Sequence, residues 1–155
     1  MISPFVAAFA EAALLLPASL LLAVYLLALR RAPLAAAWIG ALAASCAVTF
    51  GAKLLFHACG QEFTASAIIS PSGHTSFATI FYGGVAILFG PGRPRWTQRV
   101  LAVVVALLVL AVCVSRVRTG AHTEAEVAIG VAIGAASLAG FAWCQARLAR
   151  GPLPW

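Results

Sequence analysis

The chain has 155 residues and a formal net charge of +6, yet only 9% of its residues are charged and 63% are hydrophobic. Soluble globular domains carry about 25% charged residues, so this composition, with its mean hydropathy of +1.03, excludes that class and indicates an integral membrane protein. The basic residues stand in small groups at the ends of apolar runs, without a polar surface dotted with aromatic residues, which argues against nucleic-acid binding.

Five apolar runs follow one another along the chain and predict an all-α, helical membrane bundle. The N-terminal stretch lacks the basic residues that begin a cleaved signal peptide, so we interpret it as part of a retained first span. Each run has about 17 to 25 residues, enough to cross or nearly cross a hydrocarbon core of roughly 30 Å. Only short links separate the runs, which indicates a single membrane-embedded domain over residues 1–155. The expected spans are about 5–29, 34–58, 74–90, 98–114 and 126–146.

The four cysteines, Cys46, Cys59, Cys113 and Cys144, have neither CxxC nor Cys/His ligand spacing. Most of them fall inside apolar runs, where cysteine behaves as a small hydrophobic residue. Neither a disulfide framework nor a metal site is therefore expected.

The positions of the basic residues predict the orientation in the membrane. With five spans, the links after the first and third spans share one side with the C-terminus, and the positive-inside rule assigns that side to the cytoplasm. The N-terminus then lies in the periplasm or outside the cell, and we expect the inner (plasma) membrane of a bacterium. The basic residues on the cytoplasmic side are Arg30, Arg31, Arg93, Arg95, Arg99, Arg147 and Arg150.

The other ionisable residues gather on the opposite side. They are Lys53, Arg116 and Arg118, with all three histidines and all four glutamates, while the chain has no aspartate. Ionisable residues that topology does not require mark functional sites in membrane proteins, so a site is expected at this face. Lys53 by itself has an alternative explanation that is equally simple: its side chain can extend from near the end of a span so that the amine reaches the membrane interface, without any functional role.

The sequence SPSGHTS, at residues 70–76, begins the third span and predicts an anion site. Ser72 can cap the helix, and Gly73 lets the backbone approach a ligand. The first N–H groups of the helix point outward at the positive end of its dipole, which suits an oxyanion such as phosphate. His74 in the first turn can donate a proton to a leaving oxygen. An ordinary capped turn would explain the same residues without any function.

The link SRVRTGAHTEAE, at residues 115–126, adds a second histidine. If the fifth span begins near Ala121, His122 and Glu126 lie four apart on one helical face, and the carboxylate can take the second proton of the imidazole. The other ring nitrogen is then available as a nucleophile.

The same link carries Arg116, Arg118 and Glu124. The two guanidinium groups are planar donors that suit phosphate oxygens. Glu124 is expected to point elsewhere and to be solvated or paired with an arginine. A polar interfacial loop with salt bridges is the alternative to a site here.

Together, three ordered segments resemble the type 2 phosphatidic acid phosphatase family, whose signature is K-x6-R-P, then P-S-G-H, then S-R-x5-H-x3-D. The segments are KLLFHACGQ from Lys53, PSGH at 71–74, and SR at 115–116 followed by His122 and Glu126. The second part matches in full, and the third matches in its spacing and in every residue but the last. The resemblance covers residues 53–126, the motif-bearing core.

The resemblance implies a helical membrane fold, usually of six spans, that removes phosphate from lipid phosphates without a metal or other cofactor. His122 would be the nucleophile that becomes phosphohistidine, and Glu126 would orient it. His74 would protonate the leaving lipid oxygen and then activate water. The residues that would hold the phosphate are Lys53, Ser72, Gly73 and Arg116.

This chain departs from the family pattern in two places and has five expected spans where six are usual. Gly60 and Gln61 stand in place of Arg-Pro, so one phosphate-binding guanidinium is missing. We hypothesise that Arg118 replaces it from the other side of the pocket, with His57 or Gln61 contributing. The second departure is glutamate for aspartate at position 126, where the longer side chain can still reach an imidazole.

These patterns predict an integral membrane lipid phosphatase. Candidate substrates are phosphatidate, phosphatidylglycerol phosphate, a polyprenyl diphosphate or the phosphate of a lipid A-like glycolipid. Two alternatives stay open: a lipid phosphotransferase, in which a lipid alcohol intercepts the phosphohistidine, and a non-catalytic family member that binds phospholipid. The expected partners are the bilayer and the lipid phosphate, and the sequence does not indicate an oligomeric state.

Overall fold

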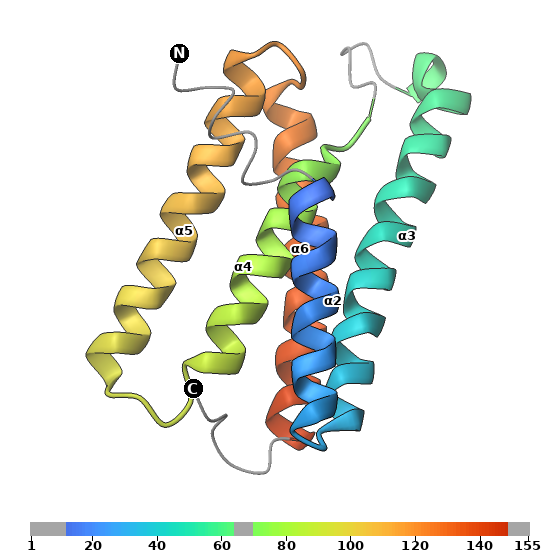
Figure 1. The fold of residues 1–155 in the computed structure, drawn as a ribbon. Helices are drawn as coiled ribbons and strands as arrows, with labels where there is room; N and C mark the ends of the chain where they lie inside the picture. The colour runs from blue at the N-terminus through green and yellow to red at the C-terminus, as the bar shows by residue number, and fades with distance from the viewer. Residues whose placement is uncertain (1–11, 64–69, 149–155) are drawn as a thin grey trace.

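The computed structural model describes residues 12–63 and 70–148, which form five helices. Successive helices run up and down, so the bundle has two ends formed by links and helix termini (Figure 1). The predicted all-helical bundle is confirmed for this part of the chain, in which no strand occurs. Residues 5–11 of the expected first span and Arg150 lie outside it. The helices are α2 (Ala12–Ala28), α3 (Ala32–Phe63), α4 (Gly73–Phe89), α5 (Arg95–Arg118) and α6 (Glu124–Leu148).

Three of the described helices are long and apolar enough to cross a membrane, namely α3 over Ala32–Ala58, α5 and α6. Helices α2 and α4 are apolar but shorter. The candidate membrane span in α3 ends at Ala58, as predicted, although the helix itself continues to Phe63, and the fourth span, expected to end at 114, continues to Arg118. Residues 115–118 therefore close a helix and do not form a link.

The grouping of basic residues at one end of the bundle is confirmed. The α2–α3 turn, the α4–α5 link and the C-terminal end of α6 lie together at the lower end in Figure 1, and they carry most of the arginines. The end of α3, the start of α4 and the α5–α6 link lie at the upper end. We call this upper end the site end.

The apolar core centres on Trp38, which is fully buried in α3. Its ring meets Phe141 of α6 edge to face at 5.2 Å between centroids, and its Nε1 donates a hydrogen bond to the Ser19 carbonyl at 3.1 Å. Gly84 of α4 makes room for the ring, because a Cβ at this position would collide with it. One large aromatic side chain thus joins four of the five helices.

The stripe of α3 that faces the bundle changes from apolar to polar towards the site end. Its members recur every three or four residues, the spacing of one helical face. In chain order they are Leu34, Trp38, Leu42, Ser45, Thr49 and Lys53. The hydroxyls and the amine have no place in an apolar core, and they therefore point to a polar site above it.

Helix α4 occupies the middle of the bundle and packs most closely on α6. A Cβ at Gly134 of α6 would lie 2.5 Å from the Ser76 carbonyl oxygen and 2.8 Å from the Thr79 Cβ. A Cβ at Gly130 would collide with Thr75 and with the Ser72 carbonyl. These two glycines therefore let α4 and α6 pack closely, as is typical of small-residue interfaces in membranes.

The outer faces of the bundle are apolar. Large side chains on them are well exposed, among them Leu20, Leu21, Val103 and Leu107 at 57% to 69%. Exposed apolar surface on this scale is unfavourable in water and normal in lipid. The bilayer is therefore the solvent of these faces, and the polar groups are confined to the interior and the two ends.

Replacement of Gly134 by alanine tests the α4–α6 contact. The added methyl group has no room beside the Ser76 carbonyl, so Gly134→Ala should lower the free energy of unfolding by about 1–3 kcal/mol. Gly140→Ala on the same helix is the matched control, because a Cβ at Gly140 meets nothing within 4 Å. Thermal unfolding in detergent micelles measures both, and equal midpoints for the two variants would contradict the packing described here.

Candidate active site

The end of α5 explains the spacing between Arg116 and His122. Gly120 follows the helix with a φ of 68°, a left-handed conformation that glycine adopts without strain. The Gly120 N–H then bonds to the Val117 carbonyl at 3.0 Å, and the Ala121 N–H bonds to the Arg116 carbonyl at 3.2 Å. This is a Schellman motif. The His122 N–H also bonds to the Arg116 carbonyl, at 3.3 Å, so the turn holds the backbone of His122 against that of Arg116.

Helix α6 begins at Glu124 and not near Ala121. The reason is a capping box around Thr123, in which the Glu126 N–H bonds to the Thr123 hydroxyl at 3.3 Å. In return the Thr123 N–H bonds to the Glu126 carboxylate at 2.9 Å. A Thr-x-x-Glu pattern favours a helix start at its threonine. His122 therefore precedes the helix, although its contact with Glu126 is the one predicted.

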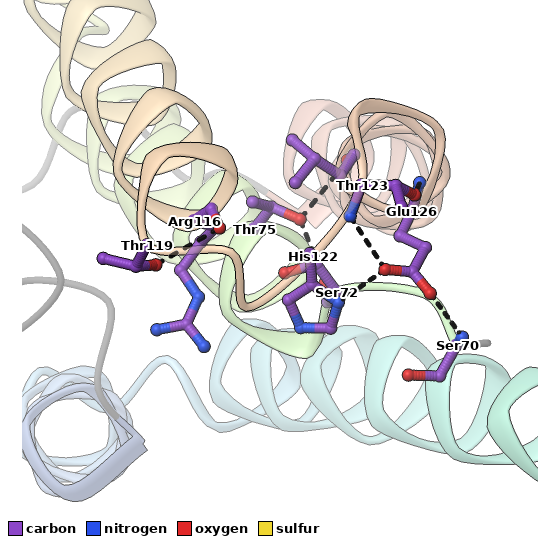
Figure 2. A network of polar contacts seen from close by, with 9 residues as sticks. Ser70, Ser72, Thr75, Arg116, Thr119, His122, Thr123 and Glu126 are labelled. Atoms are coloured by element: carbon purple, nitrogen blue, oxygen red, sulfur yellow. Dashed lines mark hydrogen bonds and ion pairs between the residues drawn. The ribbon is translucent and has the colours of Figure 1, made fainter. Parts of the chain in front are cut away.

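The Glu126 carboxylate joins three parts of the site. Besides the Thr123 N–H, it accepts hydrogen bonds from the Ser70 N–H at 2.7 Å and from the ring Nδ1 of His122 at 3.1 Å (Figure 2). The exposed fractions of the two side chains are 13% for His122 and 6% for Glu126. A carboxylate only accepts, so it places the imidazole hydrogen on Nδ1.

The segment before α4 is bound to α6 by its backbone as well. The Ser72 N–H donates to the Glu126 carbonyl at 3.0 Å. The Thr75 hydroxyl lies between the Ser72 and Val127 carbonyls, at 3.0 and 3.3 Å. These bonds place the PSGH segment beside His122, although about fifty residues separate them in the chain.

Ser72 is the N-cap residue of α4, but its side chain makes no capping hydrogen bond. The expectation that this hydroxyl caps the helix is wrong: the first turn bonds to the Ser72 carbonyl instead, which accepts from the Ser76 N–H at 3.2 Å and from the Thr75 hydroxyl at 3.0 Å. Within the described residues, the Ser72 Oγ and the Arg116 Nε are buried and have no hydrogen-bond partner. Buried polar groups without partners are costly, so a polar ligand at the site end would stabilise both of them.

The two residues contribute different chemistry to a ligand. The Arg116 Nε carries a hydrogen and positive charge, whereas the Ser72 hydroxyl can donate or accept. Figure 2 shows the Arg116 side chain and the His122 ring extending on the same side of the α5–α6 connection. An oxyanion has acceptors for both a guanidinium N–H and a hydroxyl.

Lys53 and Gly73 line one pocket, between α3 and α4. Its volume is about 210 Å³. Three buried hydroxyls also line it: Ser45 and Ser76 share a hydrogen bond of 2.8 Å, and Thr49 donates to Ser76 at 3.3 Å. The sequence analysis missed these hydroxyls, although the polar end of the α3 stripe signals them.

His74 lies in the first turn of α4 and is half-buried. It follows Ser72 by two residues, so it is at the site end together with the groups described above. His57 lies on α3 and is exposed. Gly60 and Gln61, where the family pattern has Arg-Pro, lie near the C-terminal end of α3.

Arg118 lies at a different hollow from Lys53 and Gly73. Residues two apart on a helix point about 200° apart, so Arg116 and Arg118 leave opposite faces of α5. Arg118 is exposed and lines a hollow between α5 and α6, together with Glu124. The position of Arg118 therefore does not favour the hypothesis that it supplies the missing guanidinium to the phosphate pocket. Glu124 points away from His122, as expected.

The sequence profile described as the PAP2 superfamily matches residues 39–150. The chain belongs to the PAP2 superfamily. The match confirms the resemblance to the type 2 phosphatidic acid phosphatase family, and with the apolar helices it identifies a membrane protein of phosphatase type. The chain matches none of the curated proteins and none of the solved structures with which it was compared.

No group of three or more His, Cys, Asp or Glu side chains in the described part of the chain could hold a metal ion. Three cysteines, Cys46, Cys113 and Cys144, are free thiols. In this PAP2 superfamily member, hydrogen bonds join the histidine–glutamate pair to the segment before α4, while Lys53 and Gly73 line the pocket between α3 and α4.

Removal of the Glu126 carboxylate should destabilise the fold. Glu126→Ala leaves two part-buried backbone N–H groups and the imidazole without their acceptor, so the free energy of unfolding should fall by about 2–3 kcal/mol. Glu124→Ala is the matched control in the same helical turn, because Glu124 is exposed and should matter by less than about 1 kcal/mol. Chemical unfolding in micelles measures the difference. If both variants lose the same stability, the carboxylate does not have the structural role assigned to it.

Proposed function

We propose that the protein is an integral membrane lipid phosphatase that hydrolyses a phosphomonoester or diphosphate of a lipid through a phosphohistidine intermediate. The observation that carries the proposal is the bond between the His122 Nδ1 and the Glu126 carboxylate, at 3.1 Å. Membership of the PAP2 superfamily supports the phosphatase class. The substrate and the intermediate are parts of the proposal.

His122 is the proposed nucleophile. With its hydrogen on Nδ1, the ring presents the lone pair of Nε2 to the phosphorus atom. A P–N bond forms while the P–O bond to the lipid breaks, and positive charge develops on the ring. The buried Glu126 carboxylate stabilises that charge and holds the ring in one orientation, as the aspartate does in a serine protease triad.

The phosphate oxygens are held by donors from three helices. Arg116 on α5, Lys53 on α3 and the first N–H groups of α4 bring positive charge or dipole to them, and Ser72 adds its hydroxyl. Phosphoryl transfer depends chiefly on such positioning and on stabilising the charge of the equatorial oxygens. The unsatisfied Nε of Arg116 and Oγ of Ser72 support this assignment. Glu126, one methylene longer than aspartate, also has the reach to bond with the Ser70 and Thr123 backbones.

His74 is the proposed acid and base. As the P–O bond breaks, it gives a proton to the lipid oxygen and so releases a lipid alcohol. It then takes a proton from water, whose oxygen attacks the phosphorus atom, and the P–N bond breaks to release phosphate and regenerate His122. Its place in the first turn of α4, two residues from Ser72, supports this role.

A lipid is the proposed substrate because the site lies at the end of helices whose outer faces are apolar. The head of a lipid can enter the polar centre there while its chains stay in the hydrocarbon. We also propose that the site end faces the periplasm or the cell exterior, since most arginines lie at the other end and positive residues favour the cytoplasm.

Replacement of His122 tests the nucleophile. Purified protein in mixed micelles should release inorganic phosphate from one or more of phosphatidate, phosphatidylglycerol phosphate and a polyprenyl diphosphate without added metal. His122→Gln should lower the rate by at least about a thousandfold, as loss of a catalytic nucleophile does. His57→Gln is the matched control, because His57 is exposed on α3, and it should keep the wild-type rate.

The same assay distinguishes the alternatives. Retained activity in His122→Gln would end the phosphohistidine proposal. A phosphorylated acceptor lipid in place of free phosphate would show a phosphotransferase. A wild-type protein that binds these lipids and releases no phosphate would show a non-catalytic member.

The two arginines of α5 should differ in their effect on turnover. Arg116→Ala removes a charged donor from the transferring phosphoryl group, so kcat should fall about 10²- to 10³-fold. Arg118→Ala should change kcat by less than about threefold, because a charge on the far side of the helix acts through solvent. Steady-state kinetics on one lipid phosphate compare them. A larger loss for Arg118→Ala would support the earlier hypothesis that Arg118 replaces the missing guanidinium.

A further inference from the structure

A long apolar groove runs beside α5. Near the site end, a hollow of about 530 Å³ lies between α5 and α6. A second hollow, of about 550 Å³, shares Cys113 and Val131 with the first and continues along α5 towards the other end. We call the two together the α5–α6 groove. Except for Arg118, Glu124 and Thr79, its lining consists of glycine, cysteine and aliphatic side chains.

The groove exists because α5 packs mainly on α4 and makes few contacts with α6. Helix α5 lies at the edge of the bundle (Figure 1), and only 11% of its apolar span is buried. From Val117 to Val105, both in the lining, α5 rises about 18 Å. Half of a hydrocarbon core measures about 15 Å, so the groove is long enough to hold a chain that crosses one leaflet.

The rim of the groove carries one positive and one negative side chain. Arg118 ends α5 and Glu124 begins α6, and both are exposed and line the same hollow. Neither forms an ion pair or a hydrogen bond with another residue of the described chain. A ligand that carries both a negative and a positive group can therefore bind here, the negative group at Arg118 and the positive group at Glu124.

We propose that the α5–α6 groove binds a zwitterionic phospholipid whose head carries a primary ammonium, such as phosphatidylethanolamine. One acyl chain lies in the groove. The phosphate accepts hydrogen bonds from the guanidinium of Arg118, and the ammonium donates to the carboxylate of Glu124. The groove and the proposed phosphatase centre lie on different faces of α5. The lipid in the groove is therefore bound and not consumed.

Charge complementarity favours this occupant over others. An anionic head such as phosphatidylglycerol would satisfy Arg118 and leave a carboxylate beside its own negative charge. A choline head has no N–H to give to Glu124. The bound lipid would also fill the gap beside the helix that presents Arg116 to the proposed site.

Retention of lipid by the purified protein tests the proposal. The protein is equilibrated with vesicles that contain equal amounts of phosphatidylethanolamine, phosphatidylglycerol and phosphatidylcholine, extracted with mild detergent and examined by native mass spectrometry. Wild-type protein should keep one phosphatidylethanolamine in preference to the other two. Glu124→Gln should lower the ratio of phosphatidylethanolamine to phosphatidylglycerol about tenfold, the effect of one charge-assisted contact.

Two further variants test the head and the chain separately. Arg118→Gln should reduce retention of all three phospholipids, while Arg99→Gln, on the same helix at the far end, should not. Val131→Trp fills the groove where its two hollows meet and should abolish retention. Val103→Trp, on the exposed face of α5 and outside the lining, should leave retention unchanged and controls for the size of the new side chain.

Three results would overturn the proposal. They are equal retention of the three lipids by wild-type protein, retention that Val131→Trp does not change, and a dimer whose dissociation follows Val131→Trp, which would assign the groove to a second copy. Phosphate release is not the readout, so failure of the phosphatase proposal leaves this test intact.

Discussion

Three hydrogen bonds to one buried carboxylate hold the site end together. Glu126 accepts them from the Ser70 backbone, from the N-cap of α6 and from the His122 ring. A buried charge is stable only where donors surround it. Each donor in turn loses its freedom: the segment before α4 is held against α6, and the imidazole keeps one orientation. The fold and the proposed nucleophile thus rest on the same group, which links stability to chemistry at this position.

Close contact between α4 and α6 brings the donors within hydrogen-bond distance of Glu126. Gly130 and Gly134 let the α6 backbone approach the first turns of α4, where the Ser72 and Ser76 carbonyls lie. The two helices therefore begin at the same level, and their N-terminal dipoles point at the same end of the bundle. Lipid offers no hydrophobic force to drive helices together, so such small-residue packing has to supply the contact.

Helix α5 is bound differently on its two sides. One side packs on α4 and carries Arg116 to the site, and the other side leaves a groove whose rim holds Arg118 and Glu124. The crowding of charges in the α5–α6 connection thus divides into two groups. His122, Glu126 and Arg116 lie at the candidate centre, whereas Arg118 and Glu124 line the α5–α6 groove.

The sequence by itself determined the helical membrane fold, the five helices and the His122–Glu126 pair, because hydropathy and four-residue spacing are local properties of the chain. The capping box at Thr123 and the turn at Gly120 are also local. The Thr-x-x-Glu pattern and the glycine after α5 predict them, although the sequence analysis did not use either. Only the tertiary structure decided that Ser70 binds Glu126, that Ser72 keeps its hydroxyl unbonded, and that Arg118 lines the hollow between α5 and α6. These contacts join residues far apart in the chain, or they depend on where a helix ends and what it packs against. The spacing of residues along the chain predicts neither the long-range contacts nor the helix packing.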